Sequence, residues 1–159
     1  MLYIPTNMHG THERAYGIRP EGLTKFAITN TSYRAFDIYN ADDFIQEVKD
    51  SGFNRNELWY QIKDGRTDFY NGYSKNFSVD ETFNLNLAAL NTNYIDSYAI
   101  YPKTYEFSDV LKEWDQLDNL YRQGQVNYLG LEHLEDYAQF ARTGWLCKNQ
   151  TNNIASLQF

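Results

Sequence analysis

Short apolar runs alternate with amphipathic stretches along most of the chain. The clearest run lies in residues 92–102, where aromatic and β-branched side chains cluster and Pro102 ends the pattern. Such a run is typical of a strand buried on both faces of a parallel sheet. Helical periodicity precedes it over residues 79–90 and follows it over residues 110–121, and a second apolar run comes at 124–131. This order of elements predicts parallel strands joined by helical crossovers.

The first half of the chain shows the same alternation. It predicts three further strands, within residues 6–11, 33–39 and 57–63. Leu23, Phe26 and Ala27 recur at helical spacing, which predicts a helix over residues 23–31 with these side chains on one face. The strongest helix prediction covers residues 41–51, because acidic residues fill its first turn and Gly52 follows its last.

Two regions are harder to interpret from the pattern. Residues 66–78 lack a clear period and mix aromatic residues with Asn, Gly and Ser, which predicts a loop over the strand ends. We expect Phe69, Tyr70 and Phe77 to be buried there. After a short helix at 134–141, residues 145–157 hold a candidate sixth strand.

Composition narrows the class of protein. A length of 159 residues predicts a single domain over residues 1–159. The net charge of −7 argues against nucleic-acid binding, which depends on basic side chains. No apolar stretch is long enough to span a membrane, and the N-terminus has no signal-peptide pattern. The single cysteine, Cys147, fits a reducing compartment, so the expected location is cytoplasmic.

Several motifs follow one another in the order and spacing of a known family. They are Ile4-Pro5 with His9-Gly10-Thr11, then residues 32–37, 57–63, 93–102 and 120–131, and finally Asn149-Gln150. In this succession the chain resembles an aldo-keto reductase over essentially its whole length. The resemblance implies an α/β fold built as a partial (β/α)8 barrel with about six parallel strands, since eight units of roughly 30 residues do not fit.

The resemblance also identifies candidate catalytic residues. The family uses an Asp, a Tyr, a Lys and a His around the substrate carbonyl, and Asp37 and Lys63 match the first and third. The family tyrosine follows the aspartate by five residues, a position that is Asp42 here, so Tyr39 replaces it only if three residues are deleted from the turn. The histidine position is Tyr101, which carries no positive charge at neutral pH. The catalytic candidates are therefore Asp37, Lys63, Tyr39 and Tyr101.

Candidate cofactor contacts are altered as well. The family's Ser-Asn pair, which holds the nicotinamide carboxamide, is Glu132-His133 here, whereas Gln150, next to Asn149, matches another nicotinamide contact. The family segments that hold most of the NADP(H) phosphate contacts follow the seventh and eighth strands, and no Gly-rich phosphate loop replaces them. We therefore expect no cofactor, or NADP(H) if the family activity survives.

Structural roles compete with these catalytic ones. Asp37 and Lys63 can form a buried ion pair between adjacent strand ends that serves stability alone. Tyr39 and Tyr101 can be strand-end aromatics in a chain with 14 tyrosines. The three histidines share no short spacing, so no metal site is predicted.

Three functional hypotheses remain open from the sequence. The first is a truncated, degenerate aldo-keto reductase-like domain that acts without catalysis as a binding or interaction module. The second is an NADP(H)-dependent carbonyl oxidoreductase completed by a partner chain. The third is an unrelated doubly wound α/β domain. For the first two, open sheet edges predict a homo-oligomer or a complex with another chain, and we expect no nucleic acid or membrane as a partner.

Overall fold

The computed structural model describes residues 9–10, 22–38, 41–63, 78–100, 107–131 and 154–157. Its α-helices are α1 (Leu23–Asn30), α2 (Ala41–Ser51), α3 (Val79–Ala89) and α4 (Phe107–Arg122). A short 3-10 helix, η2 (Arg55–Glu57), precedes the third strand. The strands are β1 (His9–Gly10), β2 (Ala35–Ile38), β3 (Trp59–Lys63), β4 (Ile95–Ile100), β5 (Val126–Leu131) and β6 (Ile154–Leu157).

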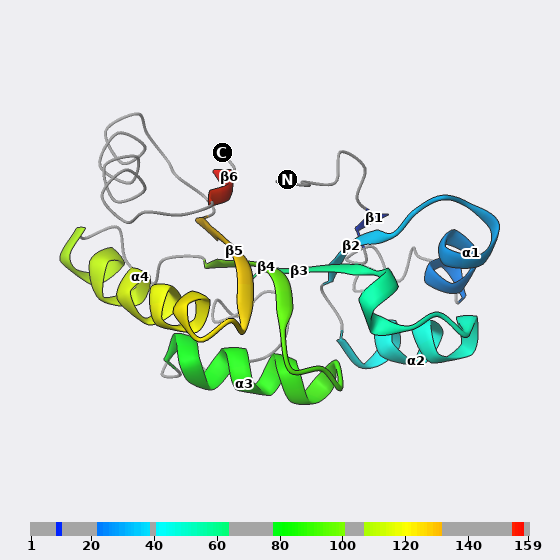
Figure 1. Ribbon diagram of the computed structural model, residues 1–159, viewed down its shortest axis with the longest axis horizontal. Helices are drawn as coiled ribbons and strands as arrows, with labels where there is room; N and C mark the ends of the chain where they lie inside the picture. Colours follow the sequence, from blue (N-terminus) through cyan, green and yellow to red (C-terminus); the bar gives the residue numbers. More distant parts are fainter. Residues whose placement is uncertain are drawn as a thin grey trace.

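These strands form one parallel sheet in the order of the sequence, β1-β2-β3-β4-β5-β6. Figure 1 shows the sheet as an open arc, with α1 to α4 along its outer side. Sequential parallel strands with all helices on one side are the arrangement of a (β/α)8 barrel, whereas a doubly wound sheet has helices on both faces. The predicted partial barrel is confirmed, and the doubly wound alternative is wrong.

The core lies between the arc and its helices. All six residues of β4 are buried, as its apolar pattern predicts. Aromatic rings carry much of the contact to the helices: Phe44 of α2 packs against Phe36 and Tyr60, and Phe83 of α3 meets Tyr98 edge-on at 5.1 Å. Such pairs stabilise the packing by about 0.5–1.5 kcal/mol beyond their burial.

Helix α2 has the predicted bounds, with Asp42 and Asp43 in its first turn. Its buried residue Glu47 accepts a hydrogen bond at 3.1 Å from the backbone N–H of Lys25, in the first turn of α1. Gly22, the residue before α1, provides no side-chain cap. A carboxylate from α2 therefore satisfies an N–H group that would otherwise be unpaired at the start of α1.

Helix α1 forms where it is predicted, but its buried face only partly coincides with the apolar spacing seen in the sequence. The buried residues are Thr24, Ala27 and Ile28, whereas Phe26 is 56% exposed. Phe26 is the largest of the three apolar side chains at helical spacing, but Ile28 lies in the core instead, and α1 packs against α2. Ala27 alone of the three predicted residues is fully on the buried side.

The start of β3 also differs from its prediction. Glu57 lies in η2 rather than in the strand, which begins at Trp59. The Glu57 side chain accepts a hydrogen bond from the backbone N–H of Asn54, and the Asn54 side chain completes a capping box. This local pairing favours a helical turn over an extended start.

Helix α3 begins and ends with recognisable signals. Ser78 caps its N-terminus through the backbone N–H of Glu81, whose own side chain bonds back to Ser78. At the other end Asn91 adopts a left-handed backbone with φ 48°, and the N–H of Thr92 reaches back to the carbonyl of Leu87. The chain therefore leaves α3 by a Schellman turn that leads directly into β4.

Some predictions lie outside the described residues. These are the aromatic loop with Phe69, Tyr70 and Phe77, and the helix at 134–141. The predicted strand regions 6–11 and 145–157 contain β1 and β6 respectively. Among the described helices none is long and apolar enough to cross a membrane, and the described residues contain no cluster of three or more metal-ligating side chains.

Candidate functional site

The strands have a helix-facing side and a concave side. Phe36, Tyr60 and Tyr98 contact aromatic residues of α2 or α3, so they point outward. Because side chains alternate along a strand, their neighbours in sequence point to the concave side. Contacts between Asp37, Gln61 and Lys63, and between the rings of Trp59 and Tyr128, agree with this assignment.

Asp37 and Lys63 meet on the concave side. The Lys63 ammonium nitrogen lies 3.4 Å from Asp37 Oδ2, and the two side chains are 21% and 16% exposed. Lys63 is the last residue of β3, and Asp37 is the last but one of β2. The pair therefore lies at the carboxyl ends of the strands, the end at which barrel enzymes carry their active sites.

Gln61 is a second partner of Asp37 that the sequence analysis missed. Its side-chain amide donates to Asp37 Oδ1 at 3.2 Å, and the residue is only 3% exposed. Asp37 thus has both carboxylate oxygens engaged, one by an amide and one by an ammonium group. The register of β2 and β3, which places Gln61 directly beside Asp37, is the signal that could have identified it.

The register extends this pairing into a polar row. Asp37, Gln61, Ser97 and Tyr128 are consecutive partners across β2, β3, β4 and β5. We refer to these four residues as the polar row. Two residues closer to the carboxyl ends, a second row of concave-side positions contains Lys63 on β3, Ala99 on β4 and Gly130 on β5. In this row the neighbours of Lys63 on β4 and β5 are therefore small.

Most of the predicted site lies outside the described residues. This holds for Tyr39, Tyr101, Glu132, His133, Asn149 and Gln150. Asp42, at the family spacing for the catalytic tyrosine, is an exposed residue in the first turn of α2. Of the eight candidates, the described structure thus brings together Asp37 and Lys63.

A larger cluster of charged and aromatic side chains, which the sequence analysis did not predict, lies at the amino ends of the strands. Arg55 forms an ion pair with Asp96 at 2.7 Å, and its guanidinium lies over the rings of Tyr60 and Tyr94 at 3.8 and 4.0 Å. It also donates to Thr92 Oγ1 and to the carbonyls of Leu58 and Tyr94. Asp96 in turn accepts from the backbone N–H of Tyr60 at 2.9 Å. We call Arg55, Tyr60, Tyr94 and Asp96 the arginine cluster.

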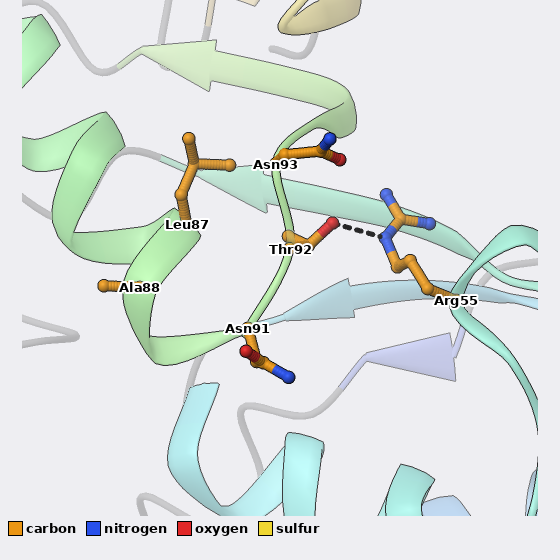
Figure 2. A pocket seen from close by; sticks show the side chains of 6 residues that line it. All are labelled: Arg55, Leu87, Ala88, Asn91, Thr92 and Asn93. Carbon is orange, nitrogen blue, oxygen red and sulfur yellow. Dashed lines mark hydrogen bonds between the residues drawn. The ribbon is translucent and has the colours of Figure 1, made fainter.

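An open hollow borders this cluster. It is lined by residues of η2, α3 and the following turn: Arg55, Leu87, Ala88, Asn91, Thr92 and Asn93. Figure 2 shows Arg55 at its edge, bonded to Thr92 rather than pointing into open space. Since its one cationic side chain is already engaged, the hollow is a weaker candidate for binding than the concave side.

Burial affects the acidity of one member of the arginine cluster. It raises the pKa of Tyr60 to about 12, because the phenolate would lose its hydration, although the charge of Arg55 acts in the opposite direction. Tyr60 is 0% exposed, and its hydroxyl has no hydrogen-bond partner among the described residues. The ring therefore serves packing and stacking, and the hydroxyl stays neutral through the physiological range.

Comparison with known proteins bears on this geometry. The chain matches no protein-family model and no curated protein sequence. It is similar in structure to an aldo-keto reductase from Bombyx mori in complex with NADP, with 19% identity and a TM-score of 0.73 over 98% of this chain and 54% of that one. An aldo-keto reductase from Brucella melitensis is 20% identical with a TM-score of 0.68, over 95% of this chain and 56% of that one. The aldose reductase from Schistosoma japonicum is 18% identical with a TM-score of 0.69, over 97% of this chain and 56% of that one.

The chain spans about half the length of these solved structures. At this level of identity the likeness shows the fold. The resemblance inferred from the sequence motifs is therefore confirmed for the fold, which is that of roughly half an aldo-keto reductase barrel.

Proposed function

We propose that this aldo-keto reductase-like domain, spanning residues 1–159, acts as a binding or interaction module and does not catalyse carbonyl reduction. The observation that carries the proposal is the position of Asp42. At the spacing of the family tyrosine, the chain has an exposed carboxylate on the first turn of α2. An exposed carboxyl group is not the phenol that the family uses as its general acid, so this position does not supply that acid.

The engagement of Asp37 supports the same proposal. Both of its oxygens have partners, Lys63 and Gln61, and the ammonium and carboxylate charges balance each other. In the family the Lys-Asp pair acts by lowering the pKa of the tyrosine. Without a tyrosine in its usual place, the pair has no acid to activate and serves to hold β2 and β3 together.

The test is a pair of measurements on the full chain. We expect no change in fluorescence when NADPH is added at micromolar concentration, and no aldehyde-dependent oxidation of NADPH. Turnover of a generic aldehyde that disappears in the Lys63→Met variant would overturn the proposal. An Arg122→Met variant, which alters an exposed helix position instead, is the matched control.

The second candidate is an NADP(H)-dependent carbonyl oxidoreductase completed by a partner chain. The contact between Asp37 and Lys63 at the carboxyl ends favours it, because catalytic groups of barrel enzymes occupy that end. NADP(H) is the cofactor that this candidate requires, and the Bombyx mori neighbour is a complex with NADP. Glu132, His133, Asn149 and Gln150 are the residues proposed to contact it.

Association through the sheet edges is part of both candidates. In the described sheet β1 pairs only with β2, and β6 pairs only with β5. Exposed strand edges favour pairing with another chain, and a two-fold dimer is the simplest closed form. Light scattering at micromolar concentration tests this association: a uniform mass of 18.7 kDa would contradict it.

A cytoplasmic location stays a prediction from the single cysteine.

A further inference from the structure

The concave side of the arc is closed in front of β4. The inward residues of this strand are Ile95, Ser97 and Ala99, which are 0%, 1% and 2% exposed. In a barrel of eight strands the eighth lies opposite the fourth and helps to cover it, whereas the described sheet ends at β6. Side chains of this same chain must therefore cover the inward side of β4.

Two aromatic rings lie in front of β4. Trp59 of β3 and Tyr128 of β5 have their ring centroids 5.0 Å apart, although β4 separates the two strands. Neighbouring strands are about 4.8 Å apart, so the backbones of β3 and β5 are separated by roughly twice that distance. The two side chains therefore converge on the inside of the arc.

Strand register places this ring pair over the middle of β4. Tyr128 is the partner of Ser97, and Trp59 comes two residues before Gln61, whose partner on β4 is also Ser97. The indole nitrogen of Trp59 and the hydroxyl of Ser97 are inaccessible to solvent, whereas Trp59 and Tyr128 as whole residues are only partly buried. The ring pair therefore covers the strand beneath it and is itself partly accessible.

The size of these two side chains fits an incomplete barrel. In a complete barrel, side chains from alternate strands fill the interior in layers of about four, most of them branched aliphatic residues. Strands β3 and β5 are alternate strands, so Trp59 and Tyr128 belong to one such layer. Indole and phenol rings have a larger surface than aliphatic side chains, so two rings can cover what several smaller side chains cover in a complete barrel.

We propose that Trp59 and Tyr128 form an aromatic strap, which closes the interior of the arc over β4 in place of the side chains that further strands contribute to a complete barrel. A single chain then keeps β4 covered without a partner, and association involves the edges of β1 and β6 rather than the interior. Binding inside the arc is confined to the level of Lys63, whose side chain is 21% exposed. These consequences for binding rest on the proposed function, whereas the strap itself rests on the fold.

Solvent exchange of the Trp59 indole N–H tests the strap. This N–H is buried and has no hydrogen-bond partner among the described residues, so its exchange is slowed by the side chains that cover it. The chain has three tryptophans, and Trp59→Phe identifies the NMR signal of Trp59 by its loss. Tyr128→Leu removes one ring of the strap and should accelerate the exchange about tenfold. Tyr128→Phe keeps the ring and should leave the exchange unchanged.

Phe83→Leu is the matched control. The rings of Phe83 and Tyr98 lie 5.1 Å apart, but they meet on the helix-facing side of β4. This variant loses a similar ring contact with the opposite side of the sheet and should leave the exchange of the Trp59 indole unchanged. Dilution of the unaltered chain should also leave it unchanged, because no second chain contributes to the strap.

Unchanged exchange in Tyr128→Leu would overturn the proposal, as would equal acceleration in Phe83→Leu or faster exchange on dilution. If Tyr128→Leu does not fold, the unaltered chain still decides the question. Nuclear Overhauser contacts between the Trp59 and Tyr128 rings are expected there, and their absence would overturn the strap. NADPH turnover in the same samples bears on the proposed function alone: turnover would overturn that function and leave the strap standing.

Discussion

The two ends of strand β3 carry ion pairs of different construction. At the amino end, Arg55 and Asp96 lie 2.7 Å apart, with aromatic rings and several hydrogen bonds around them. At the carboxyl end, Lys63 and Asp37 lie 3.4 Å apart, with the Gln61 amide on the other carboxylate oxygen. Their exposures are similar, but the contact at the amino end is shorter and stacks between two rings. We therefore expect loss of one partner to cost more free energy of unfolding at the amino end than at the carboxyl end.

Arg55→Met is the strongest test of this difference. Among the described residues, it leaves the Asp96 carboxylate bonded to the Tyr60 N–H and the Asn127 amide alone. Loss of one partner from such a pair costs about 3 kcal/mol of unfolding free energy. Urea denaturation at neutral pH measures it. If Arg55→Met loses less unfolding free energy than Lys63→Met does, the arginine cluster is not the more stabilising of the two ion pairs.

Alkaline pH tests the same cluster through Tyr60. Its folded pKa of about 12 lies above the ordinary value of 10.0, so the neutral phenol is the form that the fold favours. Ionisation of Tyr60 does not affect the unfolding free energy below pH 10, and it lowers that free energy by about 3 kcal/mol as the pH rises through 12. The check is unfolding free energy against pH for the unaltered chain and Tyr60→Phe, which has no phenol to ionise and should not show this loss. At pH 7 Tyr60→Phe should be as stable as the unaltered chain, because the removed hydroxyl is unpartnered.

Lys63→Met should have a smaller effect, about 1 kcal/mol, because Gln61 continues to bond Asp37 and both side chains are partly hydrated. A double-mutant cycle with Asp37→Asn isolates the pairwise term. A coupling energy as large as that of Arg55 with Asp96 would remove the distinction between the two ends.

Arg122→Ala should have the smallest effect. Its pair with Asp118 is short, at 2.6 Å, but the Arg122 side chain is 69% exposed. Exposed pairs one turn apart on a helix contribute about 0.3–0.5 kcal/mol. Thermal unfolding at low and high salt measures the change. A loss larger than that of Lys63→Met would mean that contact distance, rather than the surrounding groups, sets the strength of these pairs.

The sequence predicted what depends on local pattern. The bounds of α2, the burial of β4 and the parallel direction of the strands follow from periodicity and from residues that stop a helix. The sequential order of the strands was implied by the family resemblance. The sequence also paired Asp37 with Lys63, because family spacing places them at neighbouring strand ends.

What the sequence did not predict depends on contacts between distant residues. Phe26 has the spacing of a core residue but is exposed, and the covered face of α1 depends on the elements that pack against it. The partners of Arg55 come from positions up to 41 residues away. Gln61 and Ser97 are unremarkable polar residues in sequence, and only strand register places them beside Asp37 and Tyr128.

The hydrogen bond from the Lys25 N–H to Glu47 has a consequence for how the molecule opens. A helix of eight residues has few amide groups whose exchange with solvent its own turns can slow. The Lys25 amide is protected by a side chain from the next helix, so its proton exchanges only when α1 and α2 separate. In hydrogen-exchange measurements the start of α1 should therefore share the protection of α2, and the two helices should open as one cooperative unit.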